Sequence, residues 1–192
     1  MTTPVQDHEA RFVESLEKLV SSENRGALAA LRRGLGKRPG TAPEMHRLIV
    51  PYLRSNSRPD EDARFYLLAS LFASWHQGSS GGEQRVSDHL GESLAVLKKK
   101  EESSSESLEK RFEALLNCHA DDLPTHLRHM IALLRGKGVP VGWLQLLRDL
   151  RFWDHPDRLV QRRWARAFWA DLGRSEVPET QEPESDETAA TT

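Results

Sequence analysis

The sequence predicts an all-α fold, an elongated helical bundle of about nine helices that forms one body or two bundled halves. Apolar residues recur at three- and four-residue spacing through most of the chain, as on the buried face of a helix. No segment alternates apolar and polar residues over the length of a strand, and no hairpin turn joins two β-branched runs. With 192 residues, of which 38% are hydrophobic and 29% charged, the composition is typical of a soluble globular protein.

The first two helices are predicted over residues 5–21 and 25–35. Thr3 is the expected N-cap of the first, with Pro4 at the first helical position, where its missing N–H removes no helical hydrogen bond. Gly34 and Gly36 should end the second helix, because glycine readily adopts the conformation that closes a helix.

The third and fourth helices follow from capping and composition. Thr41 and Glu44 match a capping box at the start of the third helix, and Pro51 is expected to kink or end it. The fourth helix, residues 60–76, is the most apolar segment and is apolar on more than one face. We therefore expect it to lie centrally, with neighbours on several sides.

Five further helices are predicted in the second half of the chain. Pro140 is expected to begin the eighth helix, and Asp154, His155 and Pro156 are expected to cap the ninth. The apolar stripes that predict the five helices run, in order, from Leu90 to Leu97, Leu108 to Leu116, Leu127 to Leu134, Trp143 to Leu150 and Val160 to Phe168.

The loops predict a division into halves. Joints rich in glycine and serine near residues 77–85 or 100–106 are expected to act as the hinge. The N-terminal helical half is then residues 1–100, and the C-terminal half is residues 106–172. Residues 173–192 consist mainly of Glu, Pro, Thr and Ser, which predicts a disordered acidic tail.

The net charge of −2 conceals an asymmetry between the tail and the rest of the chain. Residues 175–192 contain six acidic residues and no basic one. The remaining 27 basic and 23 acidic side chains give residues 1–174 a net charge of +4. The larger part of the chain is therefore suited to an anionic partner, although the whole-chain charge does not suggest one.

Two basic clusters are the candidate nucleic-acid-binding sites. Bases near a helix C-terminus stabilise the helix dipole, which explains Arg32 and Arg33 but not the loop residues Lys37 and Arg38. Most members are arginines, whose planar fork suits phosphate. Solvated faces with internal ion pairs are the alternative. The candidates are Arg25, Arg32, Arg33, Lys37 and Arg38 in the first cluster, and Arg128, Arg135, Arg148, Arg151, Arg162, Arg163 and Arg166 in the second.

Motifs for catalysis and metal binding find little support in the sequence. There is no Cys-x-x-Cys, His-Glu-x-x-His or phosphate-binding loop, and Gly-x-Ser-x-Gly is matched only at 78–82, within a loop that is rich in glycine and serine throughout. His126 and His129 are three residues apart, but surface histidines on a helix explain them better than a metal site does. Cys118 is the single cysteine and is expected to be a small buried residue. We therefore predict a non-enzyme without metal, cofactor or small-molecule substrate.

The sequence also predicts a cytoplasmic protein with no membrane contact. No apolar run approaches the roughly 20 residues that span a bilayer. The N-terminus lacks the basic and apolar layout of a signal peptide.

Five tryptophans divide into two groups. Trp75, Trp143 and Trp164 fall in apolar stripes and are expected in the core. Trp153 and Trp169 lie off the main stripes, so either could stack on a base or pack against another subunit.

An ordered set of short motifs extends from about residue 11 to residue 172. The motifs are Arg25 to Gly34, Pro51 to Leu53, Phe65 to Ala73, Gly91 to Leu94, Leu108 to Leu116, Leu123 to Arg128, Val141 to Leu150 and Arg163 to Arg166. Together they resemble the CasB family, the small subunit of the type I-E CRISPR-associated surveillance complex Cascade, which serves antiviral defence. The acidic tail has no counterpart in this resemblance.

The resemblance implies a non-catalytic, all-helical subunit that is present in two copies within the complex. Such a subunit contacts a second copy of itself, other Cascade subunits and the backbone that contains the crRNA. It holds single-stranded DNA of the R-loop, while base pairing reads the sequence. The resemblance assigns this role to Arg25, Arg32, Arg33, Arg128, Arg148 and Arg163; charge and spacing alone add Lys37, Arg38, Arg135, Arg151, Arg162 and Arg166.

The alternative is a helical protein-protein scaffold that does not bind nucleic acid directly. In that case the arginines would serve acidic surfaces of partner proteins. The sequence alone leaves both readings open.

Overall fold

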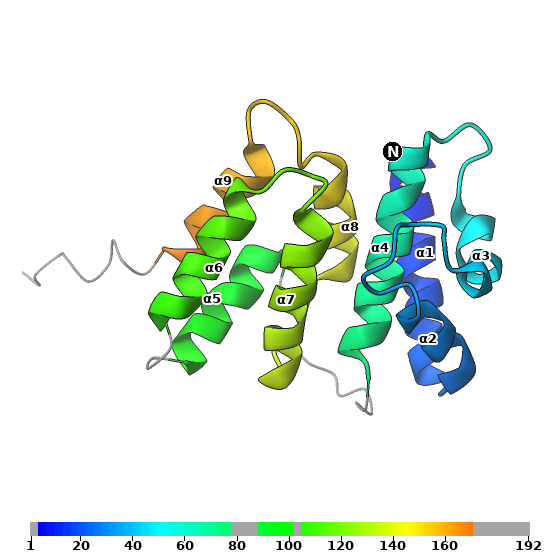
Figure 1. Cartoon of the computed structure of the whole chain (residues 1–192), viewed down its shortest axis with the longest axis horizontal. Helices are drawn as coiled ribbons and strands as arrows, with labels where there is room; N and C mark the ends of the chain where they lie inside the picture. Colours follow the sequence, from blue (N-terminus) through cyan, green and yellow to red (C-terminus); the bar gives the residue numbers. More distant parts are fainter. Residues whose placement is uncertain (1–3, 78–87, 102–104, 171–192) are drawn as a thin grey trace, which may run out of the picture.

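The chain folds into α-helices throughout the part that is described, residues 4–77, 88–101 and 105–170 of a computed structural model (Figure 1). Nine α-helices and one 3₁₀ helix are the regular elements of these ranges, and this confirms the all-α prediction. The elements are α1 (Pro4–Ser21), α2 (Arg25–Arg32), α3 (Pro43–Ile49), η1 (Val50–Tyr52), α4 (Pro59–Trp75), α5 (Leu90–Lys100), α6 (Ser105–Asn117), α7 (Leu123–Gly136), α8 (Trp143–Arg151) and α9 (Leu159–Phe168).

Some predictions fall outside the described residues. These are the Thr3 cap, the disordered tail at 173–192, residues 78–85 of the first hinge segment and residues 102–104 of the second. Buried side chains from α1 to α9 belong to one continuous hydrophobic core. The division into two halves stays a prediction.

Helix α4 occupies the middle of the molecule, between α1 and α2 on one side and α7 and α8 on the other (Figure 1). Its six consecutive residues from Leu68 to Ala73 are all buried. Such a run covers every face of a helix with 3.6 residues per turn. The predicted central position of this helix is confirmed.

Helices α5 and α9 pack closely against each other on the other side of the molecule. Gly91 of α5 faces the backbone of Trp164, and a Cβ atom at Gly91 would lie 2.6 Å from Trp164 Cα. The Trp164 side chain is fully buried, and Val160 and Phe168 are 3% exposed. The apolar stripe of α9 therefore packs into the core as predicted.

The structure corrects two details of the N-terminal half. α2 ends at Arg32, three residues earlier than predicted. The predicted capping box is wrong: the N-cap of α3 is Ala42, and the Thr41 hydroxyl donates to the Arg38 carbonyl instead. Pro51 ends α3 as predicted, since the chain continues there as the 3₁₀ helix η1.

Two helix starts in the C-terminal half were also predicted wrongly. α8 begins at Trp143, not at Pro140, whose carbonyl accepts a hydrogen bond from the Ser93 hydroxyl. α9 begins only at Leu159, after Arg158 in the left-handed conformation with φ 50°, and no side chain caps it.

The three tryptophans predicted in the core lie there, and Trp153 and Trp169 pack in or against it as well. Trp143 and Trp164 are buried, and Trp75 is partly buried against the core. Trp153 is only 2% exposed, and its indole N–H donates to the Cys118 carbonyl at 3.2 Å, so it is not available for stacking on a base.

Candidate nucleic-acid interface

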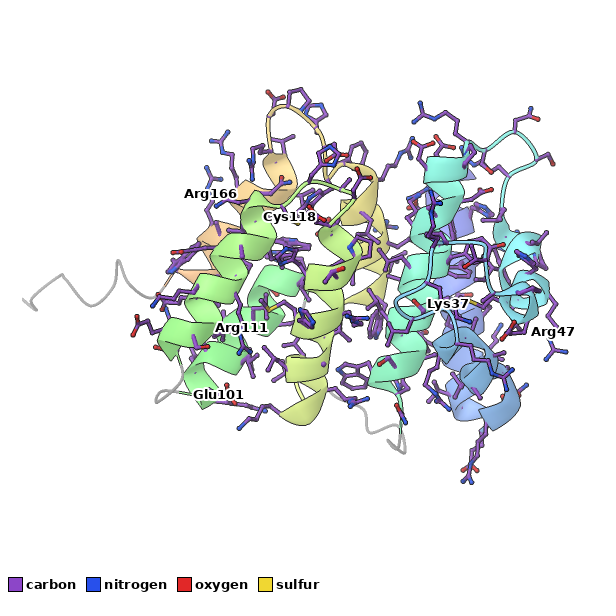
Figure 2. The ribbon with its side chains drawn as sticks, viewed as in Figure 1. Lys37, Arg47, Glu101, Arg111, Cys118 and Arg166 are labelled. Carbon is purple, nitrogen blue, oxygen red and sulfur yellow. The ribbon has the colours of Figure 1, made fainter. Side chains whose placement is uncertain are left out.

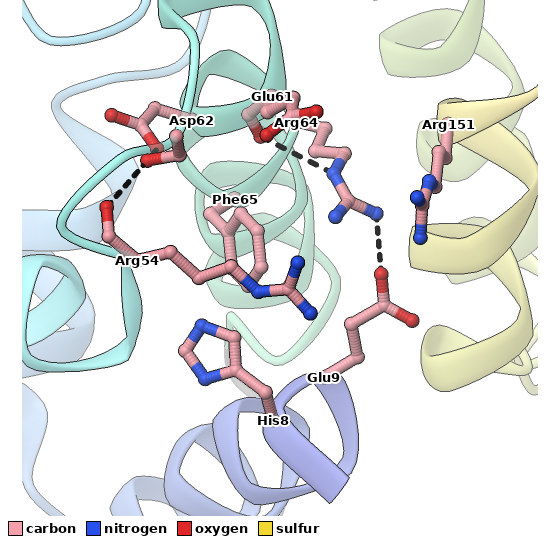
Figure 3. A pocket seen from close by; sticks show the side chains of 9 residues that line it. His8, Glu9, Arg54, Glu61, Asp62, Arg64, Phe65 and Arg151 are labelled. Carbon is pink, nitrogen blue, oxygen red and sulfur yellow. Dashed lines mark hydrogen bonds and ion pairs between the residues drawn. The ribbon is translucent and has the colours of Figure 1, made fainter. Parts of the chain in front are cut away.

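Glu9 of α1 is a buried carboxylate that holds two arginines. Its Oε1 lies 2.5 Å from Nη1 of Arg64, which extends from α4 (Figure 3). Its Oε2 lies 3.8 Å from Nε of Arg148, on α8. Arg64 also donates to the Leu147 carbonyl at 3.4 Å. This ion pair joins α1, α4 and α8, and Arg151 lies beside it in Figure 3. Glu9 therefore hydrogen-bonds Arg64 but contacts Arg148 through charge alone, since Arg148 Nε is buried without a hydrogen-bond partner among the described residues.

Asp149 of α8 is a second buried carboxylate that binds an arginine, in this case Arg163 of α9. Its side chain is 1% exposed and accepts hydrogen bonds from Gln145 Nε2 and from the Trp164 indole N–H, each at 2.7 Å. The Arg163 guanidinium donates to the same carboxylate. One buried charge thus orients an arginine that is half exposed at the surface and locks α9 to α8.

Two hollows meet at α9. The first, of about 570 Å³, lies between α8 and the start of α9 and is lined by Arg148, Arg151 and Arg163. The second, of about 560 Å³, is lined by Arg162, Arg163 and Arg166 together with His89. Arg163 and Leu159 line both, so the two hollows form one track. We call it the α8–α9 track.

Five of the twelve predicted residues are brought together by this track. They come from two helices that a loop separates in sequence, and Arg151, Arg162, Arg163 and Arg166 are classed as exposed. Only Glu9 and Asp149 supply carboxylates among the lining residues, so the lining carries more positive than negative charge. A basic track of this kind suits a phosphate backbone.

Burial lowers the pKa of His89, and the Arg163 guanidinium lowers it further, although Glu92 acts in the opposite direction. His89 stands at the N-cap of α5 and lines the track beside the arginines. Near neutral pH the imidazole is therefore neutral. The positive charge of this hollow comes from its arginines.

The first basic cluster lies on α2 and on the loop that leads to α3. Arg128 of α7 reaches this loop: a Cβ atom at Gly36 would lie 2.7 Å from Arg128 Nη1. Gly36 has a φ of 77°, which glycine tolerates. Lys37 (Figure 2) and Arg38 follow Gly36 in the chain and are exposed. Arg128 thus joins the first cluster, and the hollows of the α8–α9 track do not include these loop residues.

The remaining members of the first cluster are more dispersed. Arg33 forms an ion pair with Glu44 at 3.6 Å, and Arg25 lies 4.0 Å from Glu23 at the other end of α2. The pKa of Glu44 is lowered by its own backbone hydrogen bond and by Arg33 and Lys37. Arg32 is half-buried.

Arg135 has a structural contact. Its Nη1 donates to the Ser74 carbonyl at 3.0 Å and to Gln77 Oε1 at 3.4 Å. It therefore ties the C-terminal end of α7 to that of α4. Of the predicted residues, Arg33, Arg135, Arg148 and Arg163 have partners within the chain that come from another helix or its end.

The structure adds two apolar residues that the sequence analysis missed. Phe152, 50% exposed, and Leu159, 57% exposed, both line the first hollow. Phe152 follows α8 directly and lies off the apolar stripe of that helix. An aromatic residue outside the stripe is the signal by which the sequence could have indicated it. Leu159 was assigned to no face.

Other chemistry finds little support in the described ranges. Within them, no group of three His, Cys, Asp or Glu side chains is placed to hold a metal ion. Burial raises the pKa of the Cys118 thiol to about 11, so the nucleophilic thiolate is scarce near neutral pH. None of the helices between residues 4 and 170 that the structure describes is long and apolar enough to span a membrane.

Comparisons with known proteins agree with this architecture. A curated CRISPR-associated protein Cse2 from Thermus thermophilus is 34% identical over 177 residues, which cover 91% of this chain and 97% of the relative. The crystal structure of M. ruber CasB matches with a TM-score of 0.70 at 28% identity, over 88% of this chain and 96% of that one. A chain of a CRISPR RNA-guided surveillance complex matches with a TM-score of 0.75 at 29% identity, over 89% and 96%.

The family described as CRISPR-associated protein Cse2 matches residues 27–169, from α2 to the end of α9. This range includes both basic clusters except Arg25. It confirms the resemblance to CasB that the sequence motifs indicated. The chain therefore belongs to the Cse2 family of CRISPR-associated proteins.

Proposed function

We propose that this chain is a non-catalytic subunit of a CRISPR RNA-guided surveillance complex and that it stabilises the R-loop. In this role it binds single-stranded DNA through its phosphate backbone, without reading the base sequence. Sequence recognition is left to pairing between the guide RNA and the target strand. The proposed setting is the cytoplasm.

The α8–α9 track is the observation that carries this proposal. Five arginines line two adjacent hollows, and two of them form ion pairs with buried carboxylates. Arginines that are already oriented lose less side-chain entropy when they bind phosphate. The loop surface formed by Lys37, Arg38 and Arg128 is a second contact for the same strand or for a neighbouring one.

The proposed partners follow from the family. A relative with the same fold is part of a CRISPR RNA-guided surveillance complex. We infer that this chain contacts other Cascade subunits, the crRNA-containing backbone and a second copy of itself. Its type I-E assignment rests on the motifs that resemble CasB.

The test is the lifetime of an R-loop held by the complete complex. Arg162 and Arg166 are exposed and one helical turn apart on α9, so R162A/R166A removes two charges from the track. The control R11A/R47A removes two exposed charges from α1 and α3, outside the track. We expect R162A/R166A to shorten the R-loop lifetime about tenfold or more, and the control to leave it unchanged.

Complexes with the track variant should keep their full subunit composition. An R-loop lifetime equal to that of the wild type, in a complex that is fully assembled, would contradict the proposed function.

A protein-protein scaffold without nucleic-acid contact is the second candidate. It is favoured by the ion pairs of Arg148 and Arg163 and by the hydrogen bonds of Arg135, since these arginines contribute to the fold itself. In this case R162A/R166A would weaken assembly of the complex, while the free protein would have no affinity for DNA to lose.

A further inference from the structure

Phe152 is a large apolar side chain that the fold leaves half exposed. It ends α8 as its C-cap residue and is 50% exposed. Neighbouring aromatic residues behave differently: Trp153 is 2% exposed and Trp164 is fully buried. Phe152 does not belong to the hydrophobic core or to the partly buried residues packed against it. The fold therefore gives no packing reason for an aromatic ring at this position.

Phe152 is surrounded by another exposed apolar side chain and by arginines. Four large hydrophobic side chains are exposed in the described ranges, and two of them, Phe152 and Leu159, line the same hollow of the α8–α9 track. The Arg151 guanidinium carbon lies 5.4 Å from the centre of the Phe152 ring. Arg148 and Arg163 line the hollow beside them. An exposed ring thus stands beside three arginines of the track. It also lines a second hollow, in which Arg58, Arg64 and Arg151 lie with Asp60, Glu61 and Asp154.

This combination matches single-stranded nucleic acid more closely than other ligands. Non-specific single-strand binding combines a basic groove that follows the phosphates with aromatic side chains on which bases stack. A duplex keeps its bases inside and offers no face to a ring at the surface. An acidic protein segment would satisfy the arginines, but it would not require an aromatic ring beside them.

We propose that Phe152 is a base-stacking residue, on which one base of the single-stranded DNA lies while the arginines of the α8–α9 track hold the adjacent phosphates. This inference rests on the proposed function and adds a contact to the base itself. The contact is independent of sequence, because every base has a π face. Arg151 on the ring strengthens the platform by a cation–π contact.

The experiment measures the affinity of the full-length protein for two oligonucleotides. One is single-stranded DNA of mixed sequence, and the other has the same length and charge but contains abasic sites only. We expect Phe152→Ala to weaken binding to the normal DNA about tenfold and binding to the abasic DNA much less. Phe152→Trp should keep the affinity, whereas Phe152→Leu should lose most of it although it stays apolar.

Val50→Ala is the matched control, since Val50 is 51% exposed and lies outside the track. It should leave both affinities unchanged. An equal loss on normal and abasic DNA upon Phe152→Ala would overturn the proposal, because no base would then be involved. Unchanged DNA binding together with weaker assembly of the complex would also overturn it and would identify Phe152 as a protein contact.

The two proposals fail in different ways. The phosphate contacts of Arg162 and Arg166 exist in both oligonucleotides, so R162A/R166A should weaken binding to both equally. If it does so while Phe152→Ala weakens neither, the strand-holding function stands and the stacking proposal is overturned.

Discussion

At the residue scale, the buried carboxylate of Asp149 links the core to the surface. It accepts the Trp164 indole N–H and a Gln145 amide N–H on the buried side and the Arg163 guanidinium on the exposed side. Removing a buried acceptor leaves its donors without partners, which costs more than the lost bonds themselves. Asp149 therefore contributes both to stability and to the geometry of the α8–α9 track.

We expect Asp149→Ala to lower the free energy of unfolding by about 3 kcal/mol, because it leaves a buried indole N–H and an arginine uncompensated. Urea denaturation of the full-length protein measures this value. Asp121→Ala is the control, since the Asp121 side chain is 92% exposed and its loss should change the unfolding free energy by less than about 0.5 kcal/mol. Equal effects of both substitutions would refute the role of Asp149.

His76 makes stability depend on pH. Burial lowers its pKa to about 4, from a usual value of 6.5. Between pH 6.5 and 4 the unfolded chain binds a proton that the folded chain does not, so stability falls as the pH falls through this window. The ring packs against Phe72, with centroids 4.3 Å apart, and this contact keeps it out of water.

Between pH 7.5 and pH 5 we expect the His76 contribution to lower the free energy of unfolding by roughly 1–2 kcal/mol. The measurement is urea denaturation at both pH values. His76→Gln should remove this part of the pH dependence, whatever its own effect at pH 7.5. His119→Gln is the control, because the His119 side chain is 69% exposed. An unchanged pH dependence in His76→Gln would contradict the assignment.

At the scale of the elements, the contact between α5 and α9 depends on a glycine. A Cβ atom at Gly91 would lie 2.6 Å from both the Cα and the carbonyl oxygen of Trp164. These are backbone atoms of a buried helix, so they move only if the two helices separate. The α9 arginines on the opposite side would move with them.

Gly91→Ala should therefore lower the unfolding free energy by about 2–3 kcal/mol through overpacking. Gly136→Ala is the matched control: this glycine ends α7, and a Cβ atom there would meet nothing within 4 Å. That substitution should be neutral or stabilise the protein by up to about 1 kcal/mol. Thermal denaturation compares the two, and equal stability of both variants would contradict the close packing of α5 on α9.

At the scale of the whole molecule, helical periodicity was sufficient to predict the fold class, because each apolar stripe must be buried in a common core. It also predicted the central place of α4, which is apolar on more than one face. Helix starts were harder. The Thr41 cap was wrong because its hydroxyl bonds to the Arg38 carbonyl, a choice that depends on the loop conformation. Asp154, His155 and Pro156 suggested that α9 begins directly after them. It begins only at Leu159, because Arg158 adopts the left-handed conformation with a φ of 50°.

The candidate site was predictable in composition but not in geometry. Arginine content and spacing indicated Arg148, Arg162 and Arg166, yet the track exists only because α8 and α9 meet in space. The partner of an arginine can also lie far from it in sequence: Arg148 of α8 forms its ion pair with Glu9 of α1. Phe152 was missed because one exposed aromatic residue produces no periodic pattern.

The central claim, that the α8–α9 track holds the phosphates of single-stranded DNA, predicts a specific salt dependence. For single strands, the slope of the logarithm of affinity against the logarithm of salt concentration is about −0.7 per phosphate contact. R162A/R166A removes two exposed arginines from the track (Figure 2 shows Arg166 at the end of the molecule opposite Arg47). It should therefore make the slope less steep by about 1.4.

The most direct measurement is this slope for the full-length protein and single-stranded DNA, compared among the wild type, R162A/R166A and R11A/R47A. We expect a slope that is less steep for R162A/R166A and unchanged for R11A/R47A, although both variants lose two positive charges. Identical slopes for the two variants would contradict it, because DNA would then respond to the net charge of the protein and not to the α8–α9 track.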